Sequence, residues 1–267
     1  MLKTTLLPLS LNERYQHLSE MAAYLRHFET EKVYLCHILE SEHKKEKDKI
    51  RSTLEHVAGL MEEQGLSVET VIRRGNVAEK VCRLTTELKV DFISIKWRNK
   101  NVIKRSILGS PDVDILRICD VPTLIYKTRP FLQSGSKLRS VLYATDFQET
   151  DRKVLPYLQA TPINVDTLYL FHVRRRAPDP ETDARQLEMV ESKLNKLSKE
   201  CLQSYKKIEH SVATGSVRYQ IPRKVRQLNV DLVVIGKRDK MNPLEKIIGS
   251  TAESLPHKSR CPVLIIS

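Results

Sequence analysis

The stretch VVIGKRDKMNPLEKIIGSTAESLPHKSRCPVLII, residues 233–266, contains the features that decide the fold of this chain. An apolar run ends at Gly236, a charged loop follows, and Gly249-Ser250 opens a segment of helical character before the apolar finish at 262–266. A strand, a loop, a helix and a second strand in this order are typical of alternating α/β folds with parallel strands. The stretch therefore predicts an α/β fold.

The same pattern occurs a second time, at a constant offset of 140 residues. Residues 71–127 align with residues 211–267 without a gap, and glycine, aspartate and proline fall on the same positions. The matched pairs are Gly75 with Gly215, Asp91 with Asp231, Gly109-Ser110 with Gly249-Ser250, and Pro122 with Pro262. Two copies of one domain explain this match. The stretch TRPFLQSGSK at 128–137 has linker composition, which predicts domains at 1–128 and 138–267.

Each copy reads as strands that alternate with helices. In the second copy the expected strands lie at 140–145, 167–173, 209–214, 231–236 and 262–267. The central strands are rich in Val, Ile, Leu and Tyr without polar alternation, which is typical of strands buried on both faces of a parallel sheet. We therefore expect two tandem doubly wound, mostly parallel five-stranded sheets. Ligands of such sheets bind beyond the carboxyl ends of the strands, where the strand order reverses.

The composition excludes several classes of protein. The chain has 267 residues, 40% of them hydrophobic and 29% charged, which suits two ordinary globular domains. No apolar run approaches the roughly 20 residues of a membrane span. The net charge of +12 favours anionic partners. Lysine and arginine are dispersed, however, without an aromatic ladder or zinc-finger spacing, so binding to nucleic acid is not expected.

The five cysteines are odd in number and scattered, and none of them forms a CxxC pair. They are Cys36, Cys82, Cys119, Cys201 and Cys261. Such a pattern argues against both a disulfide framework and a zinc site. We expect reduced core thiols in a cytoplasmic protein.

Polar residues at the ends of the expected strands of the second copy are candidates for a binding site. The carboxylate of Asp146 can accept hydrogen bonds from a ribose or an adenine amine, or it can cap the next helix; both roles stay open. The next strand ends at His172-Val173, where a lone histidine on an apolar strand indicates a core role and no catalysis. No residues with metal-ligand or triad spacing accompany it.

The start of the last helix offers a second group of candidates. Gly249, Ser250 and Thr251 present backbone N–H groups and hydroxyls at a helix N-terminus, which suits a phosphate. A plain Ser/Thr-capped helix after a turn glycine is the alternative.

These motifs resemble the universal stress protein family. Its ATP-binding members carry Gly, two residues, Gly, nine residues, and then Gly with Ser or Thr. Gly236, Gly249 and Ser250 stand at matching positions, and Asp239 takes the place of the middle glycine. The segments VLYATD, FHV and CPVLII are also similar to that family, and Ile221-Pro222 resembles the tandem E-type members.

The resemblance implies an adenine nucleotide α-hydrolase-like fold that binds ATP or a related adenine nucleotide in the second domain. The implied ligand residues are Asp146 and Val173 for ribose and adenine, and Gly236, Gly249, Ser250 and Thr251 for the phosphates. Asp239 departs from the pattern, because a carboxylate about 5 Å from a triphosphate repels it by about 1 kcal/mol. The flanking cations of Lys237, Arg238 and Lys240 offset part of that repulsion.

The first copy departs further from the family pattern. Lys96 replaces the first glycine, Asn99 the middle one and Ser10 the strand-end aspartate. Gly109-Ser110 remains, but Pro111 follows and removes one donor N–H. We expect this copy to bind no nucleotide.

The resemblance implies a cytoplasmic stress-response protein that acts as a regulatory binding module without turnover. It also implies that the last strands of the two copies pair around a pseudo-twofold axis, with a possible homodimer and an unknown regulatory protein partner. A nucleotide-free scaffold is one alternative. An adenylate-forming enzyme is another, although the HIGH and SGGxDS signatures of such enzymes do not occur.

Overall fold

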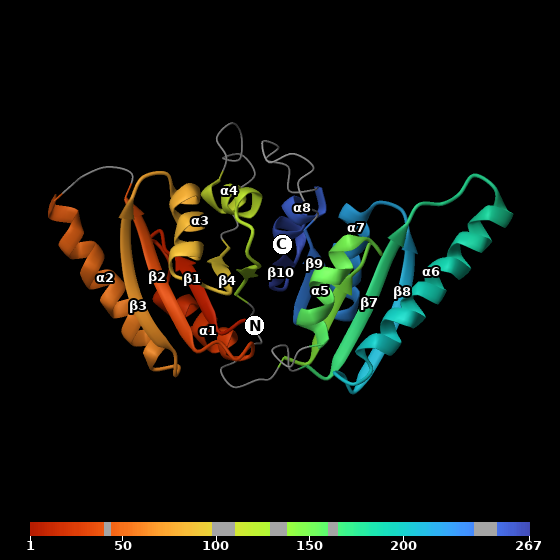
Figure 1. Ribbon diagram of the computed structural model, residues 1–267, viewed down its shortest axis with the longest axis horizontal. Helices are drawn as coiled ribbons and strands as arrows, with labels where there is room; N and C mark the ends of the chain where they lie inside the picture. Colours follow the sequence, from red (N-terminus) through yellow and green to blue (C-terminus); the bar gives the residue numbers. More distant parts are fainter. Residues whose placement is uncertain (40–43, 98–109, 129–137, 160–164, 238–249) are drawn as a thin grey trace. The chain divides into compact units, whose positions relative to one another are not determined.

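The chain forms two compact units, which are described from a computed structural model (Figure 1). Unit 1 spans Met1–Ser136 and unit 2 spans Lys137–Ser267. The residues that the structure describes are 1–39, 44–97, 110–128, 138–159, 165–237 and 250–267.

Unit 1 alternates strands and helices along the chain. Its elements are β1 (Thr4–Pro8), α1 (Tyr15–Arg26), β2 (Lys32–Leu39), α2 (Lys44–Glu62), β3 (Ser67–Arg74), α3 (Val77–Glu87), β4 (Phe92–Lys96), α4 (Pro111–Ile118) and β5 (Thr123–Tyr126). The strand order is β3-β2-β1-β4-β5, and every pair of neighbours is parallel. The order reverses between β1 and β4.

Unit 2 repeats this arrangement. Its elements are β6 (Ser140–Ala144), α5 (Glu149–Gln159), β7 (Thr167–Arg174), α6 (Pro180–Cys201), β8 (Lys207–Thr214), α7 (Val217–Leu228), β9 (Leu232–Gly236), α8 (Ser250–Lys258) and β10 (Val263–Ile266). The parallel strand order is β10-β9-β6-β7-β8, which reverses between β6 and β9. The prediction of two tandem doubly wound, parallel sheets is confirmed. The pseudo-twofold pairing of the last strands stays a prediction.

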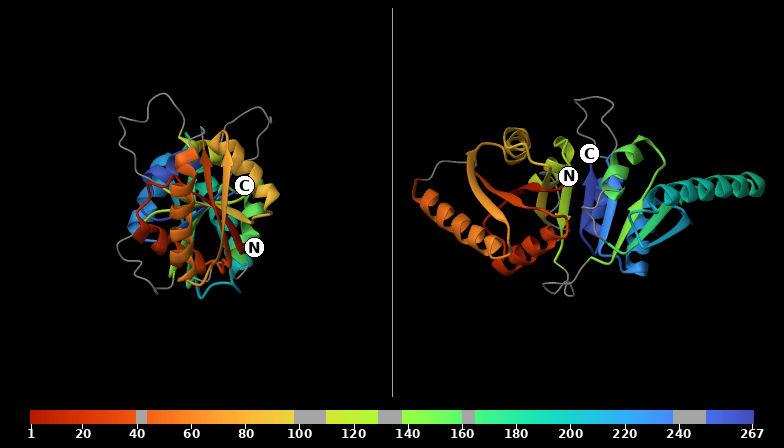
Figure 2. Two further views of the ribbon diagram at one scale, coloured as in Figure 1. Left: turned by 90° about the vertical axis from the view of Figure 1, so that its left-hand side faces the viewer. Right: turned by 60° about the horizontal axis from the view of Figure 1, so that its bottom comes forward.

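Helices cover both faces of each sheet, which explains the continuous apolar runs of the central strands. In unit 1, α1 packs beside α2 and α3 beside α4, on opposite faces of the sheet (Figures 1 and 2). In unit 2, α5 packs beside α6 and α7 beside α8. The side chains of Leu232–Ile235 in β9 are accordingly almost fully buried. Because the strands within each unit run parallel, their carboxyl ends lie at one edge of that unit's sheet.

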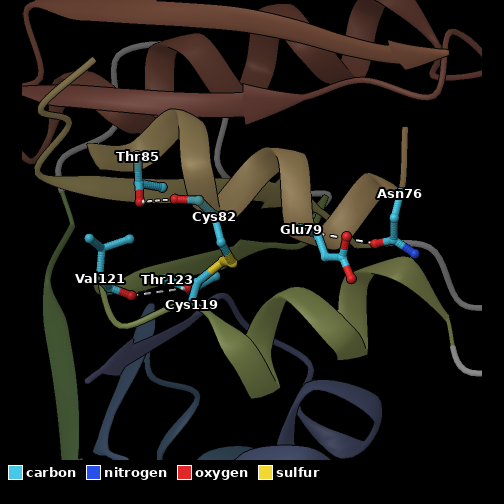
Figure 3. Close-up of a disulfide and its surroundings, with 7 residues drawn as sticks. All are labelled: Asn76, Glu79, Cys82, Thr85, Cys119, Val121 and Thr123. Carbon is cyan, nitrogen blue, oxygen red and sulfur yellow. Dashed lines mark hydrogen bonds between the residues drawn. A yellow bond between two sulfur atoms is a disulfide. The ribbon is translucent and has the colours of Figure 1, made fainter. Parts of the chain in front are cut away.

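A disulfide joins α3 to the end of α4 in unit 1, contrary to the expectation that all five cysteines are reduced. Cys82 and Cys119 are bonded, with their Cα atoms 5.1 Å apart (Figure 3). Because the partners lie 37 residues apart without a recognisable motif, only the packing of the two helices reveals the pair. Cys36, Cys201 and Cys261 are buried free thiols. Burial raises the pKa of Cys36 to about 12 and that of Cys201, which Glu200 also influences, to about 11.

The disulfide generates a prediction about stability. Closing a 37-residue loop restricts the unfolded chain, so reduction should lower the free energy of unfolding of unit 1 by about 2–4 kcal/mol. Denaturant unfolding with and without dithiothreitol measures this difference. The double variant Cys82→Ser/Cys119→Ser should unfold identically in both conditions.

Thiol titration of the denatured, unreduced protein provides an independent check. Three of the five cysteines should react, because Cys36, Cys201 and Cys261 are free. Five reactive thiols would contradict the disulfide.

The last strand of unit 2 generates a second prediction. Within the order of its own sheet, β10 is an edge strand, and all four of its residues are apolar. An uncovered apolar edge pairs readily with another strand. The fragment 138–267 should therefore form a dimer in solution, which light scattering measures. A stable, well-behaved monomer would rule out pairing through this edge.

Candidate functional site

A cavity of about 860 Å³ lies at the carboxyl edge of the unit 2 sheet. The ends of β6, β7, β8 and β9 and the starts of α7 and α8 supply its lining. This is the edge where the strand order reverses, which is the usual place for a ligand in a doubly wound fold. The volume falls within the range of small-molecule sites.

The residues that the sequence predicted for a binding site, as far as the structure describes them, lie together. Asp146, Val173, Gly236 and Thr251 all line the cavity. Helix α8 begins at Ser250. Gly249, Asp239, Arg238 and Lys240 lie outside the described residues, as do Asn99 and Gly109 in unit 1. The roles of the six nominated residues in holding a nucleotide stay a prediction.

Asp146 holds the loop between β6 and α5. Its carboxylate Oδ1 accepts hydrogen bonds from the Gln148 backbone N–H at 3.2 Å and from the Thr150 hydroxyl at 2.7 Å. Phe147 between them adopts a left-handed backbone, with φ of 56°. Asp146 therefore has a structural role in this loop, while the capping and ribose-binding roles that the sequence left open stay predictions. A carboxylate can accept about four hydrogen bonds, so this role is compatible with binding a ribose.

Gly236 is required by close packing. A Cβ added at this position would lie 2.5 Å from the Cβ of Thr150, which is too close for any side chain. The glycine thus lets the end of β9 approach the first turn of α5. In unit 1 the corresponding Lys96 carries a side chain there, and its Nζ donates to the Thr128 hydroxyl at 2.7 Å.

His172 also has a structural role. Its Nδ1 lies 2.9 Å from the carbonyl oxygen of Thr145, so this nitrogen is the donor. The ring stacks at 4.6 Å from the ring of Phe147. In unit 1, His37 makes the same contact with the carbonyl of Leu9 at 2.8 Å. Both histidines therefore tie the ends of two neighbouring strands together.

A buried network behind the cavity fixes the same loop. Asp151 accepts hydrogen bonds from the Tyr143 hydroxyl at 2.5 Å and from the Thr145 hydroxyl at 2.7 Å. The Thr145 hydroxyl in turn accepts from the Phe147 N–H at 2.9 Å. Burial raises the pKa of Asp151 although both hydroxyls oppose that shift. Sequence reasoning missed this network, because its members become neighbours only when α5 folds back onto β6.

Three arginines at the cavity also escaped the sequence analysis. Arg175 and Arg176 follow β7, Arg218 lies in the first turn of α7, and all three line the cavity. Asp146 is the only acidic residue among the described lining residues. The cavity is therefore electropositive, which favours an anionic ligand.

Two features are absent from the part of the chain that the structure describes. Within it, no three His, Cys, Asp or Glu side chains cluster closely enough to hold a metal ion. No helix there has the length and apolar character that crossing a membrane requires.

Comparison with known proteins places the chain in a family. The model of the universal stress protein family matches it twice, over residues 1–127 and 137–267. A universal stress protein of Methanocaldococcus jannaschii is 25% identical over 152 residues, which cover 48% of this chain and 94% of that protein.

Solved structures show the same tandem fold. A universal stress protein from Archaeoglobus fulgidus superposes with a TM-score of 0.74 at 21% identity, covering 99% of this chain and 96% of that one. A putative universal stress protein from Pseudomonas aeruginosa has a TM-score of 0.69 at 19% identity, covering 99% and 93%. With two family matches that together span nearly the whole sequence, the chain belongs to the universal stress protein family as a tandem two-domain member.

Proposed function

We propose that unit 2 binds an adenine nucleotide, ATP or a related one, and that the protein acts as a regulatory binding module without turnover. The observation that carries this proposal is the cavity of about 860 Å³, which gathers Asp146, Val173, Gly236 and Thr251 from separate parts of the chain. A cytoplasmic location, a homodimer and a regulatory protein partner belong to the same proposal.

The chemistry of the lining fits such a ligand. Ile221, Ile235 and Val173 provide apolar surface for a base, and the Val173 backbone would lie beside adenine. Asp146 would accept from the ribose. Gly236 with Gly249, Ser250 and Thr251 would surround the phosphates. The N-terminus of α8 supplies N–H groups and a positive dipole end for the phosphates.

The engagement of the titratable lining groups in structural bonds favours binding over turnover. Apart from the arginines, Asp146 and His172 are the titratable groups among the described lining residues. Asp146 accepts from the hydroxyl of Thr150 in α5, and His172 is bonded to the carbonyl of Thr145 after β6. Groups that hold the scaffold in this way are poorly placed to move a substrate proton.

A nucleotide-free scaffold is the second candidate, and two contacts favour it. Asp146 caps its own loop, and Gly236 is explained by its approach to Thr150 without any ligand. Mass spectrometry of the freshly purified, denatured protein separates the two candidates. A co-purified adenine nucleotide supports binding, whereas protein that neither carries nor takes up nucleotide supports the scaffold.

The loop after β9 provides the sharpest prediction. Asp239→Gly removes a carboxylate near the phosphates, so ATP should bind about fivefold more tightly, and AMP should gain less. Gly249→Val should abolish binding by crowding the phosphate site, while Gly109→Val in unit 1 should leave the affinity unchanged. Calorimetric titration of the three variants measures these differences.

Gly109→Val is the matched control, because it places the same side chain at the corresponding position of the other unit. Unfolding curves establish that all variants are folded. Equal losses from both valine variants, or no gain from Asp239→Gly, would contradict the assignment of the site.

A further inference from the structure

The proposed function assigns no specific contact to the arginines at the cavity. Arg175, Arg176 and Arg218, named here the rim arginines, are exposed and line the cavity. The side chains of Arg175 and Arg218 form no hydrogen bond or ion pair with any residue that the structure describes. Arg176 interacts electrostatically with Asp183, whereas Arg175 and Arg218 present guanidinium groups that are suited to bind phosphate.

The loop that carries two of the rim arginines is anchored at both ends. Arg174, just before them, forms a two-pronged ion pair with Asp183 of α6, with N–O distances of 2.5 and 2.8 Å. The Ala177 N–H, just after them, donates to the same carboxylate at 2.8 Å. These contacts lower the pKa of Asp183, with the Arg174 bond as the largest cause. The anchored loop presents Arg175 and Arg176 with little backbone entropy left to lose on binding.

The third rim arginine lies where a cation is unfavourable in the absence of an anion. Arg218 is in the first turn of α7, next to the positive end of the helix dipole. That turn contains no acidic residue, and the N-cap Ser216 makes no side-chain capping bond. An anion at this helix start would satisfy both the N–H groups and the guanidinium.

The corresponding helix of unit 1 shows the opposite arrangement. The side chain of Asn76 caps α3 by accepting from the Glu79 N–H at 3.1 Å, as Figure 3 shows. Glu79 places an acidic residue in the first turn, and Ala78 stands at the position of Arg218. Helix α3 of unit 1 thus has a capping side chain and an acidic first turn, whereas helix α7 of unit 2 has neither and begins beside a cavity. Departures of this kind are typical of functional sites.

The rim arginines are distinct from the phosphate site expected at α8. Helices α7 and α8 pack side by side, and both begin at the carboxyl edge of the sheet. The axes of packed helices lie about 8–10 Å apart. The cavity therefore presents two different helix starts to an anionic ligand.

We infer that the rim arginines and the start of α7 form a second phosphate subsite, so that the ligand is a nucleotide with phosphates at two separate positions. This inference rests on the proposed function and specifies its ligand class. Adenosine 3′,5′-bisphosphate is the simplest compound of that class. ADP is its isomer, with both phosphates in one chain, so the two compounds differ in the placement of a phosphate.

Calorimetric titration of the full chain with these two isomers tests the inference. The wild-type protein should bind adenosine 3′,5′-bisphosphate about tenfold or more tightly than ADP, since charged hydrogen bonds form at the second subsite. The triple variant Arg175→Ala/Arg176→Ala/Arg218→Ala should lose that preference, because its affinity for the bisphosphate falls by about tenfold more than its affinity for ADP. The substituted side chains are exposed, so the variant should remain folded.

A matched control removes the same charge elsewhere in unit 2. Arg185, Arg223 and Arg226 are exposed and do not line the cavity. Replacing these three by alanine should leave the preference for the bisphosphate intact. If both triple variants lose it equally, the effect is long-range charge and the subsite is disproved.

The remaining outcomes separate this inference from the proposed function. Equal binding of ADP and the bisphosphate to the wild-type protein would overturn the second subsite and leave nucleotide binding standing. If neither isomer nor ATP binds, the proposed function fails, and the inference fails with it.

Discussion

In each unit, one aspartate holds the first strand beside the fourth. In unit 2 the cavity depends on this pairing. Asp231 accepts from the backbone N–H groups of Arg139 at 2.8 Å and Ser140 at 3.1 Å, and its own N–H donates to the Ser140 carbonyl. Asp91 makes equivalent bonds to Lys3 and Thr4 in unit 1. The first and fourth strands are thereby locked side by side, which is where the strand order reverses. The crevice at the opposite edge follows from this pairing.

The two units share their scaffold and differ at the edge that binds ligands in such folds. Both have a histidine bonded to the end of the first strand and a left-handed residue just after it, Leu11 and Phe147. Unit 1 places Lys96 where unit 2 has Gly236, and it ties α3 to the end of α4 by a disulfide. In unit 2 the corresponding helix positions are Pro222 and Ser259, so no such tie exists there. Unit 1 thus has a covalent cross-link and a long side chain at positions where unit 2 has neither.

Much of this architecture could be predicted, because repeat spacing and strand ends are properties of the sequence itself. Asp146, Val173 and Gly236 meet because each lies at or close to the carboxyl end of a parallel strand. The contacts of Asp146 and Gly236 with Thr150 could not be predicted, because they form only when α5 packs against the ends of the strands. The grouping of the rim arginines could not be predicted for a similar reason. Arg175 and Arg176 are far from Arg218 in the sequence, and only the sheet brings the three to one cavity.

Because the chain contains two copies of one domain, the start of α7 in unit 2 can be compared with the start of α3 in unit 1. A cation in the first turn of a helix costs about 0.3–1 kcal/mol relative to a favourable residue. Unit 1 shows that this fold accommodates the favourable arrangement, with Asn76 as cap and Glu79 behind it. The backbone φ of the preceding glycine is nearly the same in both units, 133° at Gly75 and 128° at Gly215, so the geometry does not force the difference. The fold alone therefore does not explain Arg218, whereas an anion bound in the neighbouring cavity would stabilise a cation at this position.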